Sequence, residues 1–125
     1  MDKLQLIDEQ IHSFIAGDEL DWLIFRYVDH PNEYDDEVKW SRRRNYNNDW
    51  KGYSTDIKMA WRVLEKLNLL EQYEFGKDFK GSYQFFWTEY EELIPRDASN
   101  MHWFASGDTM PLAICRAALK FVRDQ

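Results

Sequence analysis

Two groups of residues in this chain have the types and spacing needed to hold an anion. Ser54, Thr55 and Asp56 directly precede an apolar pattern of helical period, and hydroxyls beside the N–H groups of a helix N-terminus can bind phosphate or carboxylate. Arg116 lies in an otherwise apolar segment, and a guanidinium can grip phosphate through two parallel hydrogen bonds. If both groups line one pocket, we expect Trp61 and Trp87 to form its aromatic walls.

Each group also has an alternative that involves no ligand. Ser, Thr and Asp are the ordinary capping residues of a helix, so the run from Ser54 to Asp56 can serve only to start the helix that follows. Arg116 can form a salt bridge with one of the many carboxylates, for example that of Asp56. The residue types alone leave both alternatives open.

A third group lies in a long polar stretch at about 29–52. Exposed aromatic rings beside arginines are typical of protein interfaces, of small anionic ligand sites and of nucleic-acid surfaces. The arginines can equally pair with the acidic residues that precede them. The residues concerned are Trp40, Arg42, Arg43, Arg44, Tyr46 and Trp50.

Several kinds of chemistry lack their usual residues. The three histidines show no metal-ligand spacing, and the single cysteine, Cys115, excludes an internal disulfide and lies on the apolar face of a predicted helix. There is no glycine-rich phosphate loop, no Gly-x-Ser-x-Gly motif and no carboxylate pair placed for acid–base catalysis. The sequence therefore predicts a protein that is not an enzyme and that needs neither a metal nor a cofactor.

The net charge and the hydropathy of the chain limit the kinds of partner and the location that we expect. With 16 Lys and Arg against 23 Asp and Glu, the net charge is −7, which disfavours direct binding to nucleic acid and makes DNA mimicry a weaker alternative. No apolar run approaches the ~20 residues of a membrane span, and residues 1–3 lack an apolar signal core, so we expect a cytoplasmic protein. Aromatic residues make up 17% of the chain, more than a core of this size needs, so a homo-oligomer is one of the expected alternatives.

Hydrophobic periodicity supplies the elements that must position these residues. It predicts helix over residues 2–28, as one kinked helix or two short ones around Gly17, and further helices over 54–68 and 110–123. Strands are expected at 72–75, 83–90 and 102–105. This order predicts a single α+β domain over 1–125, with a small antiparallel sheet of about three strands packed with three to four helices.

Three segments resemble one known family. They are the run Gly17-Asp18-Glu19-Leu20-Asp21, the segment Tyr53-Ser54-Thr55-Asp56-Ile57 followed by Ala60-Trp61 and Val63–Leu67, and the stretch Pro111–Leu119. Together they resemble the phage ABA-sandwich domain family of small phage and prophage proteins. The resemblance implies an α/β sandwich and a phage or prophage origin, and it implies no known reaction. The stretch at 29–52 departs from the family pattern, so no function is carried onto it.

The sequence thus favours a non-enzymatic phage accessory protein that acts by binding in the host cytoplasm. One hypothesis is that it sequesters a small anionic, nucleotide-like host signal, an anti-defence function, through Ser54, Thr55, Asp56 and Arg116. The alternative is a module that binds a host or phage protein through the aromatic and arginine-rich stretch around Trp40.

Overall fold

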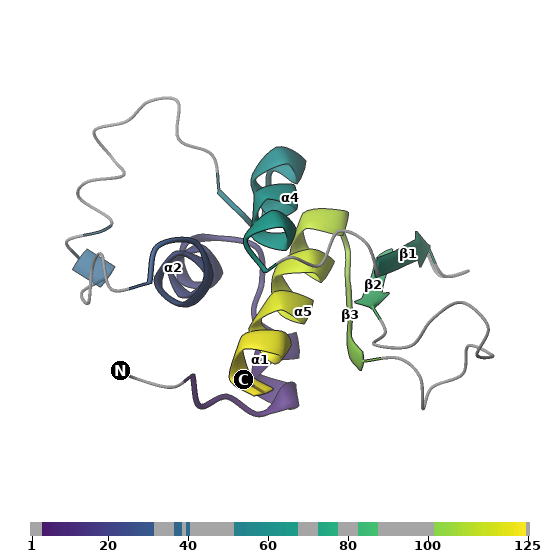
Figure 1. The fold of residues 1–125 in the computed structure, drawn as a ribbon, viewed down its shortest axis with the longest axis horizontal. Helices are drawn as coiled ribbons and strands as arrows, with labels where there is room; N and C mark the ends of the chain where they lie inside the picture. Colours follow the sequence, from purple (N-terminus) through teal and green to yellow (C-terminus); the bar gives the residue numbers. More distant parts are fainter. Residues whose placement is uncertain are drawn as a thin grey trace.

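The computed structural model describes helices, strands and their nearest connections. In order these are α1 (Asp8–Ser13), α2 (Asp18–Ile24), a π-helical turn η1 (Phe25–Asp29), α4 (Ile57–Lys66), β1 (Tyr73–Lys77), β2 (Tyr83–Trp87), β3 (His102–Gly107) and α5 (Met110–Asp124) (Figure 1). The described residues are 4–31, 37–38, 40, 52–67, 73–77, 83–87 and 102–124, without the side chains of 73–77, 83–87, 102–104 and 124.

The three strands form an antiparallel sheet in the order β1-β2-β3. Phe75 pairs with Phe85, which in turn pairs with Ala105 on the next strand. The register is irregular between Phe85 and Trp87, where the aromatic run of β2 meets β3. More of the described residues lie in helices than in strands. None of the helices in this described part is long and apolar enough to cross a membrane.

Helix α5 is the centre of the domain. Figure 1 shows it between α2 on one side and the strands on the other. One of its faces, with Cys115 and Leu119, packs into the core formed with α1, α2 and η1. Ala113 and Ile114 pack instead against α4 and β3. Because α5 is covered on both faces, a polar side chain on it must find its partner inside the fold.

The first predicted helical segment is two separate helices. The chain is extended at Phe14, the C-cap residue of α1, and Gly17 has a φ of 155° and a ψ of −165°. This backbone conformation is accessible to glycine and strained for other residues. Gly17 is also the N-cap residue of α2, although Asp18 after it has a residue type that commonly caps helices. Leu4–Ile7 lies before α1 and is not helical, although Leu4 is buried.

Helix α4 starts where the sequence predicts. Asp56 is its cap, and an Oδ1 of Asp56 accepts a hydrogen bond from the Met59 backbone N–H at 3.1 Å. Helical spacing in the sequence predicts a buried face made of Ile57, Ala60, Trp61, Leu64 and Leu67, and the observed face differs slightly. Val63 is fully buried, whereas Ile57 is 47% exposed and faces solvent. The helical face that packs is therefore rotated toward Ala60, Val63 and Leu64.

Candidate functional site

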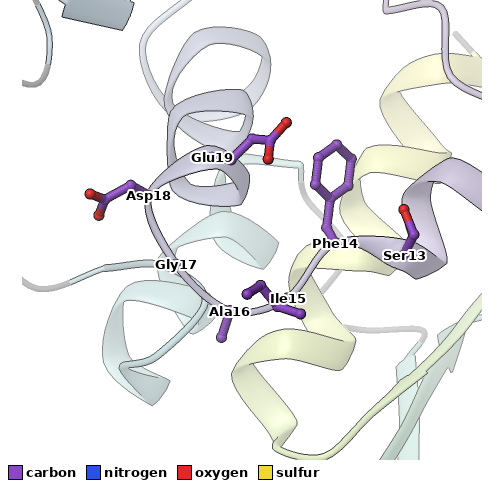
Figure 2. A pocket seen from close by; sticks show the side chains of 7 residues that line it. All are labelled: Ser13, Phe14, Ile15, Ala16, Gly17, Asp18 and Glu19. Carbon is purple, nitrogen blue, oxygen red and sulfur yellow. The ribbon is translucent and has the colours of Figure 1, made fainter.

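The loop that joins α1 to α2 encloses a surface pocket of about 430 Å³ (Figure 2). Its lining is contributed by one continuous stretch of chain: Ser13, Phe14, Ile15, Ala16, Gly17, Asp18 and Glu19. Ile15 is 79% exposed, the most exposed large apolar residue in the described part of the chain. The pocket therefore combines an apolar surface with two exposed carboxylates.

The side chains of the pocket face different ways. Figure 2 shows the carboxylate of Glu19 extending toward the side of the loop from which the ring of Phe14 rises. Asp18 points away from that side, and Ile15 lies at the bend of the loop. An occupant of the concave side would thus meet one aromatic ring and one carboxylate.

The backbone of the loop is anchored at Gly17. The Gly17 N–H donates to Oγ of Ser54 at 2.9 Å, and that hydroxyl donates in turn to Oδ1 of Asp21 at 2.8 Å. The Ser54 N–H donates to the same Asp21 oxygen at 2.8 Å, and Asp21 is only 2% exposed. Gly52 lies against the other Asp21 oxygen so closely that a Cβ there would overlap it. This buried carboxylate therefore fixes the end of the loop that enters α2.

The other end of the loop is anchored by Arg116. Its Nε and Nη2 both donate to the Phe14 carbonyl, at 3.1 and 2.6 Å, and its Nη1 donates to the Ser106 carbonyl in β3 at 2.7 Å. Partial burial lowers the pKa of Arg116, an effect that nearby Asp108 opposes. Among the described residues Arg116 forms no ion pair, so the predicted salt bridge to Asp56 is not formed.

A second polar cluster surrounds Asp29, the last residue of η1. Asp29 is 4% exposed, and its Oδ2 accepts a hydrogen bond from the Tyr53 hydroxyl. Its Oδ1 accepts from Nε of Arg62 at 3.0 Å, and Nε2 of His30 lies 3.4 Å from Oδ2. Burial and the Asp29 carboxylate raise the pKa of Tyr53, and the same carboxylate raises the pKa of Arg62. The cluster joins η1, the turn before α4 and α4 itself.

A family model described as the phage ABA sandwich domain matches residues 13–119. The chain belongs to the phage ABA sandwich domain family. The match confirms the resemblance seen in the sequence, and it spans the whole pocket as well as Ser54 and Arg116. No curated protein and no solved structure matches the chain.

In this ABA sandwich domain, the predicted anion-binding residues make bonds within the fold. Ser54 is fully buried on Asp21, Asp56 caps α4, and Thr55 is exposed, with its Oγ1 3.4 Å from the Gly52 carbonyl. Neither Ser54 nor Arg116 lines the pocket. They lie behind it, and each holds one point of its backbone.

The aromatic residues predicted to line a site lie in different parts of the fold. Trp61 is partly buried and packs against α5 and β3, and Trp87 lies in β2 with its side chain outside the described part. Trp40 is 2% exposed, with its ring 5.6 Å from that of Trp22 and 5.7 Å from that of Phe25. The expectation of an exposed Trp40 is therefore wrong, because the ring completes the core. The remaining members of that group, Arg42, Arg43, Arg44, Tyr46 and Trp50, lie outside the described residues.

Sequence reasoning missed the residues that build both polar clusters. No pattern in the sequence marks Asp21, Asp29 or Arg62 as a member of a polar cluster. The sequence near Asp29 carries no signal that separates it from the acidic residues after it. In the part of the chain that the structure describes, no three His, Cys, Asp or Glu side chains are grouped to hold a metal ion.

Proposed function

We propose that this ABA sandwich domain is a non-enzymatic phage protein that acts in the host cytoplasm by binding a protein partner at the α1–α2 loop. The observation that carries the proposal is the pocket of about 430 Å³ whose backbone is anchored at Phe14 and at Gly17. A loop held in one conformation before binding loses little entropy when a partner docks.

The exposed apolar residue at the bend of the loop supports a protein partner. A single exposed aliphatic side chain needs no explanation on a surface, but Ile15 is 79% exposed at a pocket whose backbone is fixed. Apolar side chains at the centre of a rigid patch are the usual source of interface affinity. The loop thus takes the place of the stretch around Trp40, whose ring is buried, as the proposed interaction surface.

Affinity capture from infected host cells tests this surface. The parent protein is compared with Ile15→Ser and with a control variant, Ile7→Ser, which removes an aliphatic side chain that is 61% exposed and does not line the pocket. We expect a partner that the parent and Ile7→Ser retain and that Ile15→Ser loses, with all three proteins equally folded by circular dichroism. Equal capture by all three would place the interaction elsewhere.

A second candidate function is the sequestration of a small anionic, nucleotide-like signal, which would be an anti-defence activity. Its basis is Arg116, a partly buried cation that forms no salt bridge among the described residues, and a nucleotide would have to compete with the Phe14 and Ser106 carbonyls for its N–H groups. A panel of nucleotides should then raise the Tm of the parent protein, and Arg116→Lys should weaken the response because lysine lacks the planar fork. If no nucleotide changes the Tm, this candidate is wrong.

A further inference from the structure

We propose that the pocket takes the side chain of a lysine or arginine from the partner protein, with its methylene stem on Phe14 and Ile15 and its cationic end against Glu19. This inference rests on the proposed function and names the chemistry of the partner. Three observations support it: the charge of the lining, the shape of the concave side and the position of the partly buried cation Arg116.

The charge of the lining favours a cation. Among the described residues that line the pocket, the charged ones are Asp18 and Glu19, and of these only Glu19 extends over the concave side of the loop. Glu19 is exposed, and its carboxylate has no hydrogen bond or ion pair among the described residues. With a net charge of −7, the chain as a whole also attracts basic surfaces, which speeds their encounter with it.

The apolar part of the lining favours a long basic side chain over a simple cation. Phe14, Ile15 and Ala16 line the same pocket as Glu19, so a ligand must suit an apolar surface and a carboxylate at once. Lysine and arginine do this, because they bury methylene groups along apolar surface and keep the charge at the end in contact with water. The Phe14 ring, which Figure 2 shows on the same side of the loop as Glu19, adds aromatic surface for the methylene groups.

The nearby cation Arg116 does not reverse this preference. Its Nε, Nη1 and Nη2 all donate to backbone carbonyls, those of Phe14 and Ser106, and its side chain is not part of the lining. The Phe14 carbonyl that accepts two of these bonds belongs to the backbone of the loop itself. The Glu19 carboxylate would repel an acidic side chain in this pocket. A neutral aliphatic side chain would form no ion pair with it.

Side-chain analogues of defined charge test the inference. The probes are n-butylammonium and n-butylguanidinium, with 1-butanol and butyrate as the neutral and anionic analogues, titrated into the labelled full chain and followed by the amide NMR signals of Gly17, Asp18 and Glu19. We expect the two cations to bind about two- to fivefold more tightly than 1-butanol, the range of an exposed ion pair. The preference should shrink as salt is added.

Glu19→Gln is the decisive variant. It should bring the cations to the affinity of 1-butanol, whereas Glu65→Gln, an exposed glutamate on α4 outside the pocket, should leave the preference intact. If 1-butanol or butyrate binds the parent as well as the cations do, or if no analogue shifts these signals, the inference is overturned. The capture experiment with Ile15→Ser tests the proposed function separately, so either idea can fail without the other.

Discussion

Arg116 and Phe14 lie 102 positions apart in the sequence, and two nitrogens of the guanidinium donate to the one backbone carbonyl of Phe14, at 3.1 and 2.6 Å. Phe14 is the C-cap residue of α1. The carbonyls at this end of a helix have no partner within the helix, and they carry the negative end of its dipole. A third bond, to Ser106 at 2.7 Å, extends the connection to β3. One arginine on the central helix thus joins the first helix to the sheet.

Arg116→Met should destabilise the protein by about 2–3 kcal/mol, since the variant keeps the stem and leaves two partly buried carbonyls without their charged donors. Urea denaturation measures the change in the free energy of unfolding. Arg116→Lys keeps the charge but can reach only one of the carbonyls at a time, so we expect an intermediate loss. A variant as stable as the parent would mean that water replaces the guanidinium at both carbonyls.

Much of the fold follows from local sequence signals. Asp56 as the start of α4, the helix from Met110 and the strand pattern that begins at Tyr83 all depend on caps, spacing or β-prone residues within a few positions. The sequence does not decide between one kinked helix and two helices around Gly17, because glycine tolerates both a helical conformation and the positive φ that it adopts. Only contacts made elsewhere in the fold, such as that with Ser54, select between them.

The candidate site was less predictable. The residue types of Ser54 and Arg116 suit an anion, but the structure uses those same hydrogen-bonding groups to hold backbone atoms of a loop. Nothing local to Ser54 reveals that Asp21 lies beside it, 33 positions earlier in the chain. Trp40 was expected to be exposed because its neighbours are polar, but the rings of Trp22 and Phe25 offer a contact that no periodicity encodes.

Ser54 and Thr55 allow a paired test of a buried hydroxyl that holds the loop against an exposed hydroxyl next to it in the sequence. Ser54→Ala should cost about 1–3 kcal/mol, because the Gly17 N–H loses its acceptor and buried Asp21 loses one donor. Thr55→Ala removes a similar hydroxyl from an exposed position, where substitutions usually change stability by less than about 0.5 kcal/mol. Thermal and urea unfolding of the two variants measure the contrast. Equal losses would show that the Ser54 hydroxyl contributes no more than an ordinary capping group.

Tyr53 should make the domain sensitive to alkaline pH. Burial and the hydrogen bond to Asp29 raise the pKa of Tyr53 above its ordinary value of 10.0, so the folded protein keeps a proton that the unfolded chain releases. The stability that this bond contributes is complete below about pH 10 and declines as the pH rises further.

Tyr53→Phe should lower the free energy of unfolding at pH 7 by about 1–2 kcal/mol and flatten its decline above pH 10. Tyr27→Phe, at a partly buried ring that lies 5.5 Å from the Arg26 guanidinium carbon, controls for the loss of one phenol. Urea unfolding at a series of pH values gives both quantities. If the two variants follow the same alkaline profile, the bond from Tyr53 to Asp29 is not responsible for the sensitivity.

His12 should make the domain sensitive to mild acid, because its Nε2 is buried without a hydrogen-bond partner in the described structure. Burial lowers the pKa of His12 from its ordinary value of 6.5, and the charges of Lys120 and Arg116 lower it further, while Asp8 opposes them. The unfolded chain therefore takes up this proton first, and the stability falls as the pH drops below 6.5. One proton limits the slope to about 1.4 kcal/mol per pH unit.

His12→Leu removes this titration and keeps an uncharged side chain between α1 and α5, so its stability should vary less than that of the parent between pH 6.5 and 5. The carboxylate of Asp8, whose pKa is lowered chiefly by its hydrogen bond with Arg123, contributes to the pH dependence at more acidic values in both proteins. Urea unfolding across the interval measures the two slopes. Identical slopes would mean that His12 gains its proton without disturbing the packing of α1 on α5, and the loop beyond α1 would then keep its shape in acid.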